Sequence, residues 1–140
     1  MRNQTKSGVP CIAASKRLLL IACNPNFRRT LERILCRCGY TVDGAASGEE
    51  ALARVESTAY DAIISEVMLP GSVCGLTVLD RVRRHHPNLP IILLTEAETA
   101  RMRLALEQCA GVKCLTMPVD VDQLKQLIAT STRPAGPSLA

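Results

Sequence analysis

The feature that most constrains the fold is an alternation between short apolar runs and segments whose apolar residues recur at helical spacing. The chain contains five such runs, each followed by a helix-like segment, at residues 18–22, 40–45, 61–66, 90–94 and 112–115. Apart from the segment at 40–45, their central parts are largely apolar without a period of two, which is typical of strands buried on both faces of a parallel sheet. Five strand–helix units predict an α/β fold with a doubly wound, five-stranded parallel sheet.

The predicted helices are bounded by capping signals. Asn24 and Asp120 stand where the first and last helices begin, and Ser47 with Glu50 forms a capping box before the second. Gly39 follows the first helix, where a left-handed residue is expected. Helical spacing also predicts which side chains face the sheet, among them Leu31, Leu35 and Cys38 in the first helix and Met102, Leu104, Ala105, Leu106 and Cys109 in the fourth.

The length fits one folded domain. The chain has 140 residues, enough for a single hydrophobic core, and the predicted elements span residues 17–130. Residues 1–16 are predicted to form a flexible N-terminal extension. Residues 131–140 are rich in Pro, Gly and Ser, and are predicted to form a linker or disordered tail.

Several functional classes are disfavoured by the composition. No apolar run approaches the roughly 20 residues of a membrane-spanning helix, and the first residues lack the apolar core of a secretory signal. We therefore expect a cytoplasmic protein without membrane contact, whose seven cysteines are thiols. The net charge is +4, but there is no long basic run and only 2% of the residues are aromatic. Nucleic acid would then be bound only through an output domain, if one exists.

Motifs around the predicted strands resemble those of a known family, the receiver domain of bacterial response regulators. The resemblance covers residues 17–130 and implies a flavodoxin-like (βα)5 fold. It is carried by RLLLI at residues 17–21, NPN at 24–26, GYTV at 39–42, ASGEEAL at 46–52, YDAII at 60–64, VMLPG at 67–71, LPIILLT at 89–95 and LTMPVD at 115–120.

The resemblance also points to positions at the carboxyl ends of the strands, where doubly wound folds carry their chemistry. Family members place two Mg²⁺-binding acids after the first strand, but Ala22 and Cys23 stand there. The phosphate-accepting aspartate is replaced by Glu66 and the phosphate-binding lysine by Met117. Because the transferred phosphoryl group needs a metal and a cation around it, we expect no metal site, no cofactor and no catalytic activity.

Two further positions correspond to the family's conformational switch. Thr95 is retained, whereas the aromatic side chain that follows it is replaced by Cys114. Two interpretations of Glu66 stay open. Its longer side chain imitates the phosphorylated state, with Thr95 donating a hydrogen bond to it, or it is an ordinary strand-end glutamate that remained after phosphorylation was lost.

The cysteines near the strand ends suggest a redox or soft-metal site. Cys23, Cys74 and Cys114 are all expected near the same rim. They come from separate loops without a short ligand spacing, and cysteine is a common core residue, so this interpretation is disfavoured.

The sequence therefore predicts an atypical receiver domain of two-component (phosphorelay) signalling that acts as a phosphorylation-independent interaction module. Its partners would be signalling proteins bound through the fourth helix, fifth strand and fifth helix, including residues 99–108 and 120–129. Homodimerisation is left open. The alternatives are a small-molecule- or redox-responsive domain, because the rim is less polar than in a receiver, or the receiver part of a longer regulator.

Overall fold

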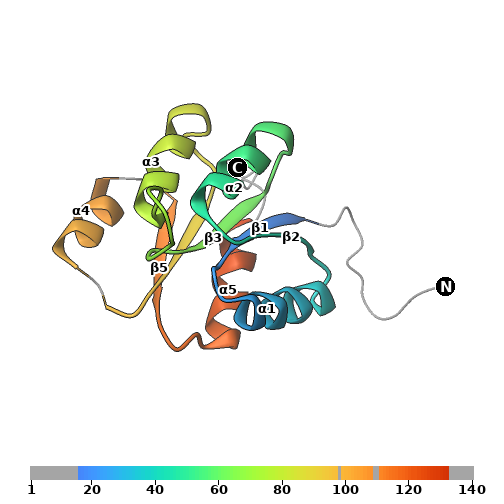
Figure 1. Ribbon diagram of the computed structural model, residues 1–140. Helices are drawn as coiled ribbons and strands as arrows, with labels where there is room; N and C mark the ends of the chain where they lie inside the picture. Colours follow the sequence, from blue (N-terminus) through green and yellow to red (C-terminus); the bar gives the residue numbers. More distant parts are fainter. Residues whose placement is uncertain (1–15, 98, 109–110, 133–140) are drawn as a thin grey trace, which may run out of the picture.

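A computed structural model describes residues 16–97, 99–108 and 111–132. It contains a five-stranded parallel sheet in the order β2-β1-β3-β4-β5, covered by helices on both faces (Figure 1). The strands are β1 (Arg17–Ile21), β2 (Thr41–Ala45), β3 (Ala62–Glu66), β4 (Ile91–Thr95) and β5 (Val112–Thr116). The helices are α1 (Pro25–Arg37), α2 (Gly48–Ser57), α3 (Gly75–His85), α4 (Ala100–Gln108) and α5 (Val121–Ser131). The predicted α/β fold with a doubly wound, five-stranded parallel sheet is confirmed.

Two aliphatic cores enclose the sheet, one on each face. In β1, Leu18 and Leu20 pack with α1 and α5, whereas Leu19 and Ile21 pack with α2, α3 and α4. All four side chains are fully buried. A strand with both faces covered has no polar side, which explains the continuous apolar run in the sequence.

The predicted caps form hydrogen bonds. Asn24 accepts one from the amide of Phe27 at 3.0 Å, and Asp120 accepts one from the amide of Gln123 at 3.1 Å. Ser47 accepts one from the amide of Glu50 at 3.1 Å. The Glu50 carboxylate reaches back to the amide of Ala46 at 2.8 Å, one residue before the expected partner.

Two predicted core residues are exposed instead. Cys38 lies at the C-cap of α1, where the chain leaves the helix toward Gly39 with its φ of 99°, so the side chain no longer follows the helical register. Leu104 is 53% exposed. It is two residues after the buried Met102, and residues two apart on a helix point in nearly opposite directions. The predictions for Ala105 and Cys109 fall on side chains outside the described residues.

A small polar cluster fixes the edge of the sheet opposite β5. The Asp43 carboxylate of β2 accepts hydrogen bonds from the hydroxyl of Tyr60 at 2.7 Å and from Nε of Arg17 at 3.2 Å. Burial alone would raise the pKa of Asp43, but the hydrogen bonds from Tyr60 and Arg17 outweigh it and lower the pKa. The cluster joins β1, β2 and the segment before β3.

Further predictions were a flexible extension at the start of the chain, a linker or disordered tail at its end, and cysteines in the thiol form. The predicted extension and tail lie outside the described residues, apart from Lys16, Ser131 and Thr132. In the described part of the chain, Cys23, Cys36 and Cys38 are free thiols, as expected. None of the described helices is both long enough and apolar enough to cross a membrane.

Candidate functional site

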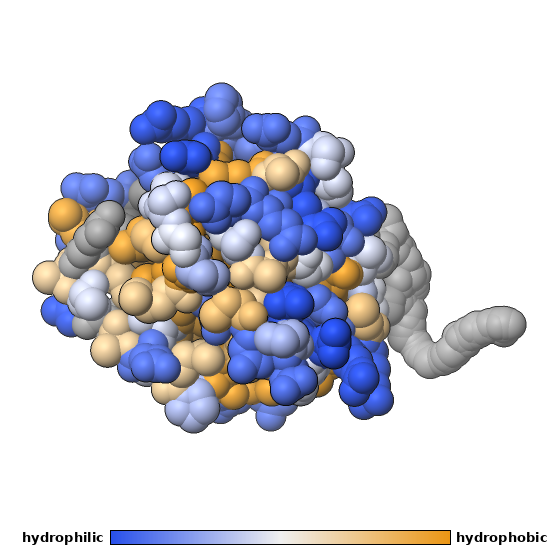
Figure 2. Space-filling view, in the orientation of Figure 1, coloured by the Kyte–Doolittle hydropathy of each residue, from blue (hydrophilic) through white to orange (hydrophobic). Residues whose placement is uncertain are grey.

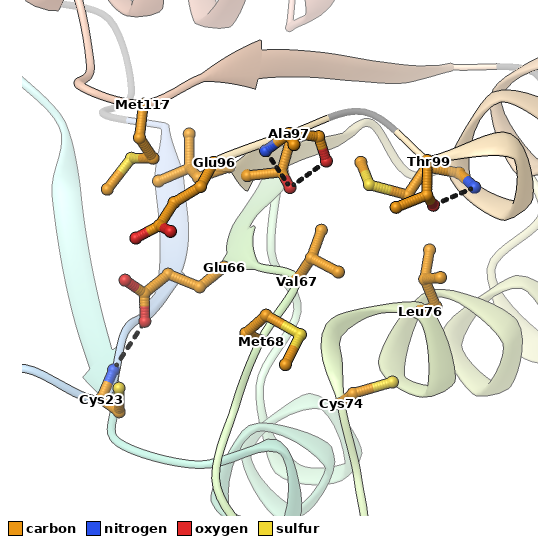
Figure 3. A pocket seen from close by; sticks show the side chains of 13 residues that line it. Cys23, Glu66, Val67, Met68, Cys74, Leu76, Glu96, Ala97, Thr99 and Met117 are labelled. Atoms are coloured by element: carbon orange, nitrogen blue, oxygen red, sulfur yellow. Dashed lines mark hydrogen bonds between the residues drawn. The ribbon is translucent and has the colours of Figure 1, made fainter.

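A pocket of about 770 Å³ opens at the carboxyl ends of β1, β3 and β4 (Figure 3). It is also bordered by the beginnings of α3 and α4 and by the loop after β5. Its lining residues are Cys23, Glu66, Val67, Met68, Cys74, Leu76, Leu94, Thr95, Glu96, Ala97, Thr99, Met102 and Met117. The pocket therefore occupies the edge where the parallel topology places binding sites.

Glu66 ends β3 and points into the pocket. One of its carboxylate oxygens, Oε1, accepts a hydrogen bond from the backbone amide of Cys23 at 3.0 Å. Figure 3 shows this contact crossing from β3 to the loop after β1. The glutamate is thus held by the neighbouring loop, and its second oxygen faces the pocket.

The Cys23 thiol is kept in its protonated form by its surroundings. Burial raises the pKa of Cys23, and the negative charge of Glu66 and a hydrogen bond to that carboxylate raise it further. A protonated thiol is a poor nucleophile and a poor metal ligand. These contacts argue against a reactive cysteine at this rim.

Thr95 ends β4 and makes only local hydrogen bonds. Its hydroxyl donates to the carbonyl of Ala97 at 2.9 Å and accepts from the amide of the same residue at 3.3 Å. The hydrogen bond from Thr95 to Glu66, which one interpretation of the sequence required, is absent. A threonine hydroxyl readily bonds to the backbone two residues on, so a local partner replaces the distant one.

Of the other predicted site residues, some line the pocket and some lie away from it. Met117 lines the pocket, whereas Ala22 is fully buried and its amide donates to the carbonyl of Ala45 at 3.0 Å. Cys74 lines the pocket with Cys23, but Cys114 packs against the core of the α2–α4 face. The three cysteines are therefore not all brought together. Among the described residues there is no group of three His, Cys, Asp or Glu side chains that could hold a metal ion.

The loop after β3 adds features that sequence reasoning missed. Met68 in this loop is 81% exposed although it lines the pocket, and Leu76 at the start of α3 lies across from it. Gly75 allows α3 to begin directly over the end of β3, because a Cβ there would collide with the carbonyl of Glu66 and with Val67. The Gly75 amide donates to the carbonyl of Val67 at 2.8 Å.

Glu96 is the other residue that sequence reasoning missed. It follows Thr95 directly, and its carboxylate points toward that of Glu66 in Figure 3. Inspecting one residue beyond the end of β4 would have found it.

In Figure 2, apolar side chains gather toward the centre and left of the visible face, with hydrophilic residues around them. Figure 1 places β5 and the elements around it in this region.

Comparisons with known proteins agree with this architecture. The family model of the response regulator receiver domain matches residues 18–129. The transcriptional regulatory protein TcrA of Mycobacterium tuberculosis is 35% identical over 108 residues, which are 77% of this chain and 42% of that protein. The sensor protein EvgS of Escherichia coli O157:H7 is 34% identical over 123 residues, 87% of this chain and 10% of that protein.

Solved structures show the same likeness. A putative response regulator from Chloroflexus aurantiacus J-10-fl has a TM-score of 0.76 at 31% identity, covering 85% of this chain and 98% of that one. The chemotaxis protein CheY4 of Vibrio cholerae has a TM-score of 0.77 at 25% identity, covering 84% and 99%. The chain spans less than half the length of the two curated relatives. With a family match over residues 18–129 and this five-stranded sheet, the chain belongs to the response regulator receiver family.

Proposed function

We propose that this receiver domain works without phosphorylation, as a module that binds another signalling protein. The observation that carries the proposal is that the strand ends lack the two acids and the lysine that the family resemblance leads one to expect. Ala22, Cys23 and Met117 stand where the family resemblance places two metal-binding acids and a lysine. Mg²⁺ requires oxygen ligands in near-octahedral geometry, and Glu66 is the one carboxylate left at these positions.

The chemistry of phosphoryl transfer supports the same conclusion. Charge that develops on the transferred group must be neutralised by the metal and by a cation. Among the described residues that line the pocket there is no Lys, Arg or His. On this proposal, the domain is not an enzyme and uses no cofactor.

The proposed binding surface is formed by α4, β5 and α5, called here the α4-β5-α5 face. β5 is an edge strand of the sheet, and Lys113 on it is exposed. Leu104 on α4 is an exposed apolar side chain, and a partner that covers it would remove apolar surface from water. The similarity to a transcriptional regulatory protein and a sensor protein supports kinases or output domains as partners.

The experiment places a photo-crosslinking amino acid at Leu104 in the full chain, with the same group at Arg29 on the exposed side of α1 as the control. The proposal expects capture of a signalling protein from position 104 and not from position 29. The purified partner should then bind the unlabelled domain with the same affinity before and after treatment with acetyl phosphate and Mg²⁺. Binding that requires this treatment, with a phosphorylated residue found by mass spectrometry, would contradict the proposal.

A further inference from the structure

The pocket at the carboxyl edge of the sheet has the dimensions of a small-molecule site. Its volume of about 770 Å³ lies inside the range of roughly 300–1,000 Å³ in which such ligands are bound. Most of its wall is aliphatic or thioether, from Val67, Met68, Leu76, Leu94, Met102 and Met117. A wall of this kind favours a ligand with an apolar body.

Among the described residues, the charged groups of the wall have one sign. Glu66 and Glu96 are the charged lining residues, and their carboxylates point toward one another near Cys23 and Met117 (Figure 3). Within the described part of the chain, neither carboxylate is paired with a Lys, Arg or His side chain. The amide of Cys23 is the hydrogen-bond donor to Glu66, and it carries no charge.

The arrangement separates a polar end from an apolar end. In Figure 3 the two carboxylates lie at one side of the pocket, whereas Val67 and Leu76 lie at the other. An apolar ligand without a cation would desolvate the carboxylates at a cost. A cation placed between them would be attracted by both carboxylates at once, and the partial burial of Glu66 reduces the screening of its charge by water.

A metal ion fits this pocket poorly. A hard divalent cation takes about six or more oxygen ligands. Two carboxylates supply few, and one of their oxygens already accepts the Cys23 amide. The described residues contain no cluster of three His, Cys, Asp or Glu side chains suited to a metal. The chemistry that matches both ends of the pocket is an organic cation.

We propose that this pocket binds a small organic cation with an apolar body, an ammonium or amidinium group on a hydrocarbon framework. The cation lies between Glu66 and Glu96, and the hydrocarbon part packs against Val67, Leu76 and Met102. This binding does not depend on the phosphorylation-independent role proposed above, since it uses only the walls of the pocket.

The probe is hexylammonium chloride, added to the full chain and followed by amide NMR shifts, with 1-hexanol and sodium hexanoate as probes of equal length. Hexylammonium should give saturable shifts that cluster at Cys23, Val67 and Leu76. Hexanol should bind more weakly because it lacks the charge, and hexanoate should not bind because the carboxylates repel it. Scattered or unsaturated shifts, or equal affinity for hexanol and hexylammonium, would overturn the proposal.

Variants identify the groups that hold the cation. Glu66→Gln and Glu96→Gln each keep a side-chain oxygen but lose the charge, and each should weaken hexylammonium binding by about tenfold or more. Glu56→Gln on the exposed surface of α2 is the matched control and should bind as the wild type does. Circular dichroism confirms that each variant is folded. Unchanged binding by both pocket variants, or an equal loss in Glu56→Gln, would show that the carboxylates do not form the site.

Discussion

The carboxylate of Glu66 accepts a hydrogen bond from the backbone amide of Cys23 at 3.0 Å, while the hydroxyl of Thr95 bonds to Ala97. The glutamate therefore ties the end of β3 to the loop after β1 rather than to β4. A built-in imitation of a phosphorylated state would need the charge to act on Thr95, because a switch is biased only through contacts that differ between its two states. The observed contacts separate the two residues.

The first prediction concerns this separation. Glu66→Gln and Thr95→Ala should each leave the backbone NMR shifts of α4 and β5 essentially unchanged, because neither residue contacts the other. Thr95→Ala should lower the free energy of unfolding by about 1 kcal/mol through the lost hydrogen bonds to Ala97. Large matching shifts in both variants along residues 99–115, with millisecond exchange in relaxation dispersion, would show that a working switch survives.

The second prediction concerns magnesium. Millimolar Mg²⁺ should cause no saturable shift at Cys23 or Glu66, because Glu66 and Glu96 supply few oxygen ligands and one of these oxygens already accepts the Cys23 amide. Amide NMR titration at constant ionic strength measures this, with NaCl as the control for salt effects. Clustered shifts at the two residues that saturate with Mg²⁺ and not with NaCl would contradict it.

The third prediction uses the thiol beside Glu66. The pKa of Cys23 is raised by burial, by the negative charge of Glu66 and by a hydrogen bond to its carboxylate. Glu66→Gln removes the charge, so the pKa of Cys23 should fall and more thiolate should be present at pH 8. Alkylation of Cys23 by iodoacetamide, followed by mass spectrometry, should be faster in the variant.

Cys36 on the exposed side of α1 serves as an internal reference for that measurement. Its alkylation rate should be the same in the wild type and in Glu66→Gln, because it does not line the pocket. An equal rate increase at both cysteines would indicate general loosening of the variant rather than removal of the charge.

The fourth prediction tests the close approach of α3 to β3. A methyl group at position 75 would collide with the carbonyl of Glu66 and with Val67, both of which are backbone atoms that move little. Gly75→Ala should therefore lower the free energy of unfolding by about 1–3 kcal/mol, measured by urea denaturation. Gln126→Ala on the exposed side of α5 is a control that should change it by less than about 0.5 kcal/mol. Equal stabilities for the wild type and Gly75→Ala would mean that α3 can shift at no cost.

Local signals were enough to predict the fold from sequence, but they located the site only in part. Continuous apolar runs and the caps at Asn24, Ser47 and Asp120 act within a few residues, and the structure retains them. The rule that ligands lie at strand ends found Glu66 and Thr95. Met68 and Leu76 were missed because the path of the loop after β3 places them, and loop paths depend on tertiary contacts.

The errors have the same physical origin. An apolar residue at helical spacing was taken to face the core, yet Cys38 lies where the helix has already ended and Leu104 lies on the outer side of α4. Of the two open interpretations of Glu66, the one that needs a bond from Thr95 is not supported, because the Thr95 hydroxyl bonds to the nearby backbone of Ala97 instead.

The last prediction concerns the Tyr60 hydroxyl and the Asp43 carboxylate, which lie 2.7 Å apart. The pKa of Asp43 is lowered overall, because the hydrogen bonds from Tyr60 and Arg17 outweigh the effect of burial. The pKa of Tyr60 is raised by burial and by the hydrogen bond to Asp43. The carboxylate form of Asp43 and the neutral form of Tyr60 are thus both favoured by folding, so this contact stabilises the fold only while both forms persist.

Removing the hydroxyl with Tyr60→Phe should lower the free energy of unfolding by about 1–2 kcal/mol at pH 7. The difference between the wild type and Tyr60→Phe should shrink as the pH falls below about 3.8, the ordinary value for Asp, because a protonated Asp43 no longer favours the bond. It should shrink again as the pH rises above about 10, where the tyrosine of the unfolded chain ionises. Urea denaturation of both proteins between pH 3 and pH 10.5 measures this difference. A difference that stays constant over the whole range would mean that Tyr60 stabilises the fold through its ring alone.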